Sequence, residues 1–115
     1  MKTVKKPWGS EIWFAQNDKY VGKILTVKKG HRLSRQYHEK KHETFYSIQG
    51  RFLLEINGRT RTVKEGQPVT IKPGIIHRMH AKFCDIRIVE VSTPEVWDIV
   101  RIDDDYGRRA AAKDR

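Results

Sequence analysis

The chain has 115 residues, with 24 Lys and Arg against 14 Asp and Glu, which gives a formal net charge of +10. This length predicts one domain, and 37% hydrophobic and 10% aromatic residues are too many for a disordered chain. Apolar runs reach only four residues and there is one cysteine, so we expect no membrane-spanning helix, signal-peptide core or internal disulfide framework. We expect a soluble cytoplasmic protein whose charge favours an anionic partner: a phosphorylated small molecule, a nucleic acid or an acidic membrane surface.

Short strands separated by glycine turns are the main pattern along the chain. Strands are expected over residues 20–27, 52–56, 59–63, 69–71 and 85–91. Asn57 and Gly58 between two of these runs predict a β-hairpin, because both residues tolerate positive φ. Residues 34–44 and 95–98 leave room for a short helix. The pattern predicts an all-β sandwich or barrel over residues 1–108 and a polar, frayed tail over residues 109–115.

Residues 38–42 read HEKKH and match the HExxH signature of zinc proteases. That chemistry needs the string on a helix, so that both imidazoles share one face and the glutamate acts as base. Here the string runs into the β-branched and aromatic residues 44–48, and no third-ligand motif follows. We therefore interpret the match as a coincidence.

Interpreted as strands, the same region carries candidate metal ligands. Residues i and i+2 share one face of a strand, which puts Gln36 and His38 on a common face. Glu43 opens the next strand, and His77 opens another after the turn at Gly74. We expect Gln36, His38, Glu43 and His77 to converge inside the mouth of a barrel. Two imidazole nitrogens, a carboxylate and an amide oxygen suit zinc, iron, manganese, nickel or cobalt.

The spacing of these residues resembles the two motifs of the cupin superfamily. The first motif is matched by Gly30, Gln36, His38, Glu43 and Gly50, with glutamine where the first histidine usually stands. Residues 66–77, which read GQPVTIKPGIIH, match the second motif. The Gln-x-His variant resembles the type II phosphomannose isomerases, in which a cupin domain follows a mannose-1-phosphate guanylyltransferase domain. Further matches are KPWGS at residues 6–10, RLS at 32–34, DIVR at 98–101 and DYGR at 105–108.

This resemblance implies a single-domain, all-β cupin fold, that is, a double-stranded β-helix or jelly-roll barrel. It implies a metal-dependent aldose–ketose isomerase that converts mannose 6-phosphate to fructose 6-phosphate through an enediol. The implied ligands are Gln36, His38, Glu43 and His77, and the implied metal is zinc, with manganese, cobalt, nickel or iron as alternatives. Cupins commonly form homodimers, so the resemblance also implies a homodimer.

The chain departs from the family pattern directly after the ligand histidine. The family usually carries His-His-Arg there, whereas residues 39–41 read EKK. Lysine keeps the positive charge but lacks the planar fork with which arginine grips phosphate. The identity of the sugar phosphate, and whether the domain is an active isomerase, are therefore left open.

Candidates for the remaining roles follow from position and resemblance. Lys41, His42 and His80 are candidates for the catalytic base, and strand parity favours none of them. Arg32 and Arg78 match family arginines and are candidates for substrate binding. The i, i+2 spacing puts Arg32 on the face of the metal ligands and turns Arg78 away from it.

Other functions remain possible from the sequence. Two histidines and one carboxylate also suit an iron oxygenase, and a cupin can bind or sense a sugar without acting on it. A nucleic-acid-binding β-barrel would need aromatic side chains beside Lys or Arg on one strand face. Phe45 and Tyr46, the best aromatic candidates, are expected on opposite faces, so nucleic acid is the less favoured partner.

Overall fold

The alternating segments of the sequence form eleven β-strands in the computed structural model, which describes residues 1–108. The tail predicted over residues 109–115 lies outside the described residues. The strands are β1 (Lys2–Lys6), β2 (Gly9–Gln16), β3 (Val21–Val27), β4 (Arg35–Tyr37), β5 (Glu43–Gln49), β6 (Phe52–Ile56), β7 (Arg59–Val63), β8 (Pro68–Ile71), β9 (His77–His80), β10 (Ile86–Ser92) and β11 (Val100–Asp103).

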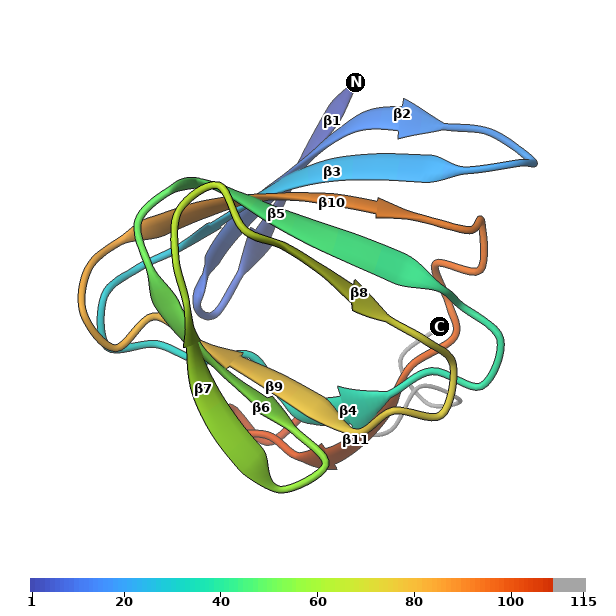
Figure 1. Ribbon diagram of the computed structural model, residues 1–115. Coiled ribbons are helices and arrows are strands. Elements are labelled where there is room, and N and C mark those ends of the chain that lie inside the picture. The colour runs from blue at the N-terminus through green and yellow to red at the C-terminus, as the bar shows by residue number, and fades with distance from the viewer. Residues whose placement is uncertain (109–115) are drawn as a thin grey trace.

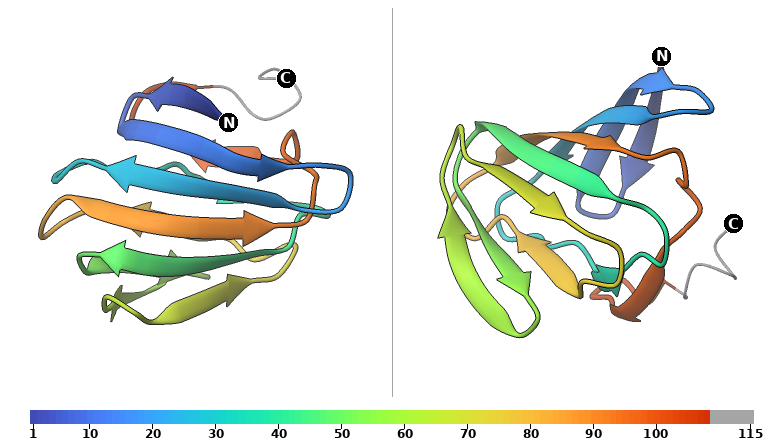
Figure 2. Two further views of the ribbon diagram at one scale, coloured as in Figure 1. Left: turned by 90° about the horizontal axis from the view of Figure 1, so that it is seen from above. Right: turned by 45° about the vertical axis from the view of Figure 1, so that its right-hand side comes forward.

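The strands make two sheets that face each other (Figure 1). The order is β1-β2-β3-β10-β5-β8 in the first sheet and β11-β4-β9-β6-β7 in the second, and every pairing is antiparallel. The left view of Figure 2 shows the six strands of the first sheet side by side. Adjacent strands such as β3 and β10 are far apart in sequence, because the chain crosses repeatedly from one sheet to the other. The all-β double-stranded β-helix expected from the sequence is confirmed.

The core fills the space between the two sheets with every second residue of their strands. In β3, for example, Val21, Leu25 and Val27 are buried, whereas Ile24 and Thr26 on the other face are partly exposed. Burial of each such side chain contributes about 1.5–3 kcal/mol to folding. The largest buried side chains are Phe52, Leu25, Leu54, Ile71, Met79, Ile86 and Ile88.

The predicted hairpin joins β6 to β7. Asn57 has φ of 48° and Gly58 has φ of 81°, the two positive values that a tight two-residue hairpin turn requires. Strand pairing runs from Phe52 opposite Val63 to Ile56 opposite Arg59. This part of the sequence prediction is confirmed.

Neither segment that left room for a helix forms one. Residues 34–44 contain β4, and residues 95–98 lie in a turn. The HEKKH string crosses the loop between β4 and β5, so it lacks the helix that a zinc-protease site requires. Across residues 1–108, no helix is long and apolar enough to cross a membrane.

Gly9 lets β2 lie close to β3. A Cβ atom at this position would lie 1.9 Å from the carbonyl oxygen of Thr26, and the φ of Gly9 is +153°. Any larger residue would therefore collide with the backbone of β3. The tight contact keeps the preceding Trp8 in the core, where it is 2% exposed.

Candidate metal centre

Three buried side chains from different strands meet in a cavity between the two sheets. His38 follows β4, Glu43 opens β5 and His77 opens β9. Glu43 Oε2 lies 2.9 Å from His38 Nε2 and 3.2 Å from His77 Nε2. One ligand atom from each of the three residues lies within 4.8 Å of the others, so these residues, called the metal group below, could hold a metal ion. The structure thus brings together three of the four predicted ligands.

Backbone carbonyls orient both imidazole rings. His38 Nδ1 donates a hydrogen bond to the Asp98 carbonyl oxygen at 2.5 Å, and His77 Nδ1 donates to that of Ile75 at 2.9 Å. With Nδ1 held by a backbone carbonyl, each ring directs its Nε2 atom toward Glu43. Two imidazole nitrogens and a carboxylate oxygen thus converge, which is a donor set that divalent metal ions prefer. The donor set and its orientation therefore fit a metal ion.

Gln36, the fourth predicted ligand, lines the same cavity. It lies opposite His77 in the pairing of β4 with β9, so the two side chains point to the same side. Gln36 Nε2 donates to Ser34 Oγ at 3.1 Å, which leaves the acceptor Oε1 as the atom that could meet a cation. Ligation by Gln36 stays a prediction.

Lys41 lies beside the three-residue group, between two buried carboxylates. Its Nζ atom is 3.3 Å from Glu43 Oε1 and 3.3 Å from Glu90 Oε2. Burial by itself would lower the pKa of Lys41, but the charges of Glu90 and Glu43 outweigh burial and raise it. Burial would likewise raise the pKa of Glu43, which Lys41 and hydrogen bonds with both histidines hold well below its ordinary value. Lys41 is therefore an ammonium and Glu43 a carboxylate.

Asp98 fixes the loop that carries Lys41. Its carboxylate accepts hydrogen bonds from the backbone N–H groups of Glu39 at 3.0 Å, Lys40 at 2.6 Å and Lys41 at 2.8 Å. Burial opposes ionisation of Asp98, but these three hydrogen bonds lower its pKa. Since the carbonyl of Asp98 also holds the ring of His38, one residue positions two groups of the centre.

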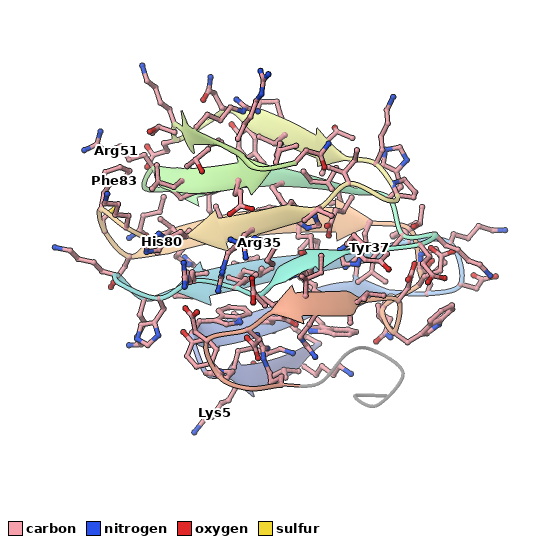
Figure 3. The ribbon with its side chains drawn as sticks, turned by 90° about the horizontal axis from the view of Figure 1, so that it is seen from below. Lys5, Arg35, Tyr37, Arg51, His80 and Phe83 are labelled. Carbon is pink, nitrogen blue, oxygen red and sulfur yellow. The ribbon has the colours of Figure 1, made fainter. Side chains whose placement is uncertain are left out.

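The other two candidates for the catalytic base lie outside the cavity. The side chain of His42 is exposed, and its backbone N–H donates to Thr93 Oγ1. His80 lies on the outer face of the second sheet, on the same side as Arg35 and Tyr37 (Figure 3). Of the three candidates, only Lys41 lines the cavity with the metal group.

The prediction that Arg32 lies on the same face as the metal ligands is wrong. Arg32 forms an isolated bridge with His80, and regular strand begins only at Arg35, so the two-residue period does not extend back to it. Its guanidinium instead donates to Asp105 at 2.6 and 2.8 Å, on the outer side of the sheet. Arg78 also donates to Asp105, at 2.9 Å, and points away from His77 as predicted. Substrate binding by Arg32 or Arg78 stays a prediction, and it would need a site outside this cavity.

Sequence analysis missed several charged residues of the cavity, among them Glu11, Lys23 and Glu90. Each is buried on the inner face of its strand. The sequence did contain a signal for such residues, namely a charged residue at a position where the alternation predicts an inward side chain. Glu90 is an example, because it continues the buried alternate positions of Ile86 and Ile88. Such a residue is costly to bury without a partner or a function.

The two aromatic residues considered for nucleic-acid binding face opposite sides, as predicted. The ring of Phe45 lies 6.1 Å from that of His77, inside the protein. Tyr46 points outward from β5 and is 44% exposed. These two side chains therefore cannot stack bases on one surface.

Comparison with known proteins identifies relatives along most of the chain. The family described as "Mannose-6-phosphate isomerase C-terminal" matches residues 1–104. The mannose-1-phosphate guanylyltransferase ManC of Salmonella typhimurium is 31% identical over 111 residues, which cover 93% of this chain and 23% of that protein. The alginate biosynthesis protein AlgA of Pseudomonas aeruginosa gives the same identity and coverage. The chain thus spans about a quarter of the length of these relatives.

Solved structures share the fold at low sequence identity. KdgF from Halomonas sp. superposes with a TM-score of 0.75 and 18% identity, covering 83% of this chain and 87% of that one. An RmlC-like cupin from Shewanella frigidimarina gives 0.67 and 12%, with coverage of 76% and 77%. A putative sugar phosphate isomerase from Acidithiobacillus ferrooxidans gives 0.60 and 12%, with coverage of 65% and 50%. The fold is a cupin, and because the family match takes in both sheets and the metal group, this chain belongs to the family of mannose-6-phosphate isomerase C-terminal domains.

Proposed function

We propose that this domain is a metal-dependent aldose–ketose isomerase of sugar phosphates, with mannose 6-phosphate and fructose 6-phosphate as its substrate and product. The observation that carries the proposal is the buried group of His38, Glu43 and His77, which faces a cavity in a domain of this family. The cavity has a volume of about 120 Å³, and polar and aromatic side chains line it together. Polar groups that converge in a partly enclosed cavity are the usual feature of a binding site for a small molecule.

His38, Glu43, His77 and Gln36 would hold a divalent ion, zinc by preference, with manganese, cobalt, nickel or iron as alternatives. A bound divalent ion would supply a Lewis acid that polarises the carbonyl group of the sugar. The backbone carbonyls behind both imidazoles would keep the ligand atoms directed at that ion.

Lys41 is the residue of the chain to which we assign a direct role. The isomerisation moves one proton from carbon 2 to carbon 1 and one from the oxygen on carbon 2 to the oxygen on carbon 1. As an ammonium held between Glu43 and Glu90, Lys41 can donate a hydrogen bond to a sugar oxygen that becomes negative in the enediol stage. It stands where the family usually carries arginine, which keeps the positive charge at that place.

A homodimer and a cytoplasmic location belong to the same proposal. The outer face of the first sheet supports the dimer, since Phe14, Tyr46, Ile48 and Val91 on it are each more than 40% exposed. Exposed apolar patches of this kind mark surfaces that bind another protein. The use of a single cysteine is compatible with a reducing compartment.

Turnover of mannose 6-phosphate, followed by NMR, tests the proposed reaction. Protein stripped of metal with a chelator and reloaded separately with zinc, manganese, cobalt, nickel or iron should regain activity with at least one ion. His38→Ala and His77→Ala should abolish that activity because each removes a ligand. His42→Ala is the matched control, since His42 is exposed outside the cavity, and it should leave turnover unchanged.

The alternative is a cupin with another activity, because a set of two histidines and one carboxylate would also suit an iron oxygenase. Absence of turnover with every ion, together with tight and selective binding of iron, would favour an oxygenase. Absence of turnover with retained sugar-phosphate binding would favour a sensing role. Either result overturns the isomerase proposal.

A further inference from the structure

The proposed isomerisation needs a general base, and the residues considered from the sequence do not supply it. A general base must reach the proton on the carbon atom next to the carbonyl group of the sugar. His42 is exposed and His80 lies on the outer face of the second sheet. The proposed function already gives Lys41 the task of a hydrogen-bond donor. Another side chain of the cavity must therefore act as the base.

Within residues 1–108, the carboxylates that line the cavity are those of Glu11, Glu43 and Glu90. Glu43 belongs to the metal group, and its Oε2 atom faces both imidazoles. Glu11 accepts a hydrogen bond from Trp13 Nε1 at 2.9 Å, and β3 and β10 separate its strand, β2, from β5. Glu90 lies on β10, directly beside β5 (left view of Figure 2). Of the two carboxylates outside the metal group, Glu90 is therefore on the strand closer to it.

Lys41 joins Glu90 to the metal group. Its Nζ atom is 3.3 Å from Glu90 Oε2 and 3.3 Å from Glu43 Oε1, so these two carboxylate oxygens are at most twice that distance apart. The carbon atoms of a sugar lie one bond beyond the oxygen atoms that would face the metal group. A sugar held there by its first two oxygen atoms would therefore bring its first two carbon atoms within reach of Glu90.

The two oxygen atoms of Glu90 can have different tasks. Lys41 donates a hydrogen bond to Oε2, which fixes the orientation of the carboxylate. Oε1 is thereby left as the atom that can face a substrate. The side chain is 8% exposed, and because Glu90 lines the cavity, this exposure is toward the cavity.

Glu90 shares its ammonium partner with the metal group. Lys41 lies between Glu90 and Glu43, whereas Lys23, the register partner of Glu90 on β3, has Glu11 at 3.6 Å. Along this row, the described residues supply three carboxylates and two ammonium groups. A buried carboxylate without a cation of its own is costly to keep. Proteins retain such groups chiefly where function needs them.

We propose that Glu90 is the general base of the isomerisation and carries one proton between carbon 2 and carbon 1 of the sugar. This assignment rests on the proposed function. Glutamate carboxylates are suited to this kind of proton transfer. The hydrogen bond from Lys41 would hold the base beside the group that donates to the sugar oxygen, so both act on neighbouring atoms of one substrate.

The proposed step conserves atoms and electrons. Glu90 accepts the proton on carbon 2 of mannose 6-phosphate, and the electron pair of that C–H bond forms the double bond of the enediol. The carbonyl oxygen on carbon 1 takes up a proton and becomes a hydroxyl. Glu90 then gives its proton to carbon 1, while the hydroxyl on carbon 2 loses a proton and becomes the carbonyl of fructose 6-phosphate. No oxidant or reductant is needed.

Glu90→Gln tests this assignment, because the amide keeps the shape of the side chain but cannot take up the proton. In the full chain reloaded with the ion that best activates the wild-type protein, kcat should fall about 100-fold or more. KM for mannose 6-phosphate should change less than about threefold, because the lost interaction belongs to the transition state. Calorimetry should show that zinc and fructose 6-phosphate still bind. Glu39→Gln, the same change at an exposed carboxylate outside the cavity, is the matched control and should leave kcat unchanged.

Rescue by a small carboxylate separates a base from a residue that only positions Lys41. Glu90→Ala leaves space in the cavity, so added formate should restore part of the turnover in proportion to its concentration. Chloride at the same ionic strength should restore none. Retained zinc binding shows that a variant still folds, and Glu90→Gln carries the test if Glu90→Ala does not fold.

The possible failures can be told apart. Full activity of Glu90→Gln, or loss of activity in Glu11→Gln instead, overturns the assignment and leaves the proposed function standing. A low kcat in Glu90→Gln without rescue of a folded Glu90→Ala by formate also overturns it, because Glu90 would then only position Lys41. Absence of turnover by the wild-type protein with every ion refutes the proposed function and this assignment together.

Discussion

Lys41 links the stability of the cavity to its chemistry. Two buried carboxylates approach its ammonium at 3.3 Å, and one of them also belongs to the metal group. A buried ion pair adds little net stability while it is intact, but removal of one partner leaves an uncompensated charge in the interior. Lys41 is therefore most needed when no metal neutralises Glu43.

Lys41→Met should lower the free energy of unfolding of the metal-free protein by about 3–5 kcal/mol. Zinc should reduce this loss, because a divalent ion compensates the charge on Glu43. Urea denaturation with and without zinc measures both values. Lys40→Met is the matched control, since Lys40 is exposed in the same loop, and it should shift stability by no more than about 0.5 kcal/mol. A loss for Lys41→Met that is small, or the same with zinc as without, would contradict this account.

Asp105 makes stability depend on pH in the acid range. Hydrogen bonds from Arg32 hold the pKa of Asp105 below its usual value, burial opposes them slightly, and Arg78 adds to the lowering. Because the pKa is lower in the folded than in the unfolded state, ionised Asp105 stabilises the fold above about pH 4. That stabilisation is lost as the pH falls through the folded-state pKa.

Asp105→Asn should therefore be less stable than wild type near neutral pH, and the difference should shrink as the pH falls. Thermal unfolding followed between about pH 7 and pH 3 measures this. Asp18→Asn, in the turn between β2 and β3, loses the same charge without these partners and serves as control. A constant difference between Asp105→Asn and wild type across that range would show that Asp105 does not contribute by ionisation.

At the level of whole elements, two glycines show how β-strand contacts depend on backbone freedom. Gly9→Ala would place its Cβ against the Thr26 carbonyl, whereas Gly58→Ala would meet open space at a φ of +81°. We expect Gly58→Ala to cost about 1 kcal/mol in stability from φ strain. Gly9→Ala should cost at least about 3 kcal/mol, since strain and overpacking add. Chemical denaturation of both variants compares them, and equal losses would mean that β2 can move away from β3.

Alternation along single strands predicted most of the fold and the centre of the site. The hairpin at Asn57 and Gly58 follows from local spacing, because it depends on one turn. Strand parity put His38, Glu43 and His77 on inward faces, and the spacing that resembles the cupin motifs supported their convergence from different strands. Parity failed at Arg32, where the strand is interrupted.

The contacts of Asp98 could not be predicted, since they join a C-terminal turn to a loop about 60 residues earlier. Nothing in the sequence near Asp98 specifies that pairing. The meeting of Glu11 and Lys23 with Glu90 in the cavity was missed for the same reason, because these residues come from distant parts of the chain. Their proximity follows only from the register of the first sheet.

At the scale of the whole molecule, the outer face of the first sheet is a row of apolar side chains. Ile12, Ile24, Val89 and Tyr46 are consecutive partners across β2, β3, β10 and β5. In the proposed homodimer this face packs against a second copy. Val89→Lys, near the middle of the row, should then convert the dimer to a monomer, because it would bury a charge in the interface.

Light scattering after gel filtration measures the mass of each variant. Thr62→Lys, on the exposed strand β7 of the other sheet, adds the same charge elsewhere and should leave the dimer intact. A wild-type protein with the mass of one chain would refute the dimer. If Thr62→Lys dissociated the dimer and Val89→Lys did not, the interface would instead lie on the second sheet.

The hydrogen bond from His38 to the carbonyl of Asp98 also governs when the metal centre can form during synthesis. The ribosome releases a protein from its N-terminus onward, so all four predicted ligands leave it before Asp98 does. A growing chain that ends before β10 lacks both the strand that lies between β3 and β5 and the carbonyl that orients His38. Pairings between such distant segments also form slowly. The nascent polypeptide therefore carries its predicted ligands without a formed site, and binding of the proposed metal would require the finished fold.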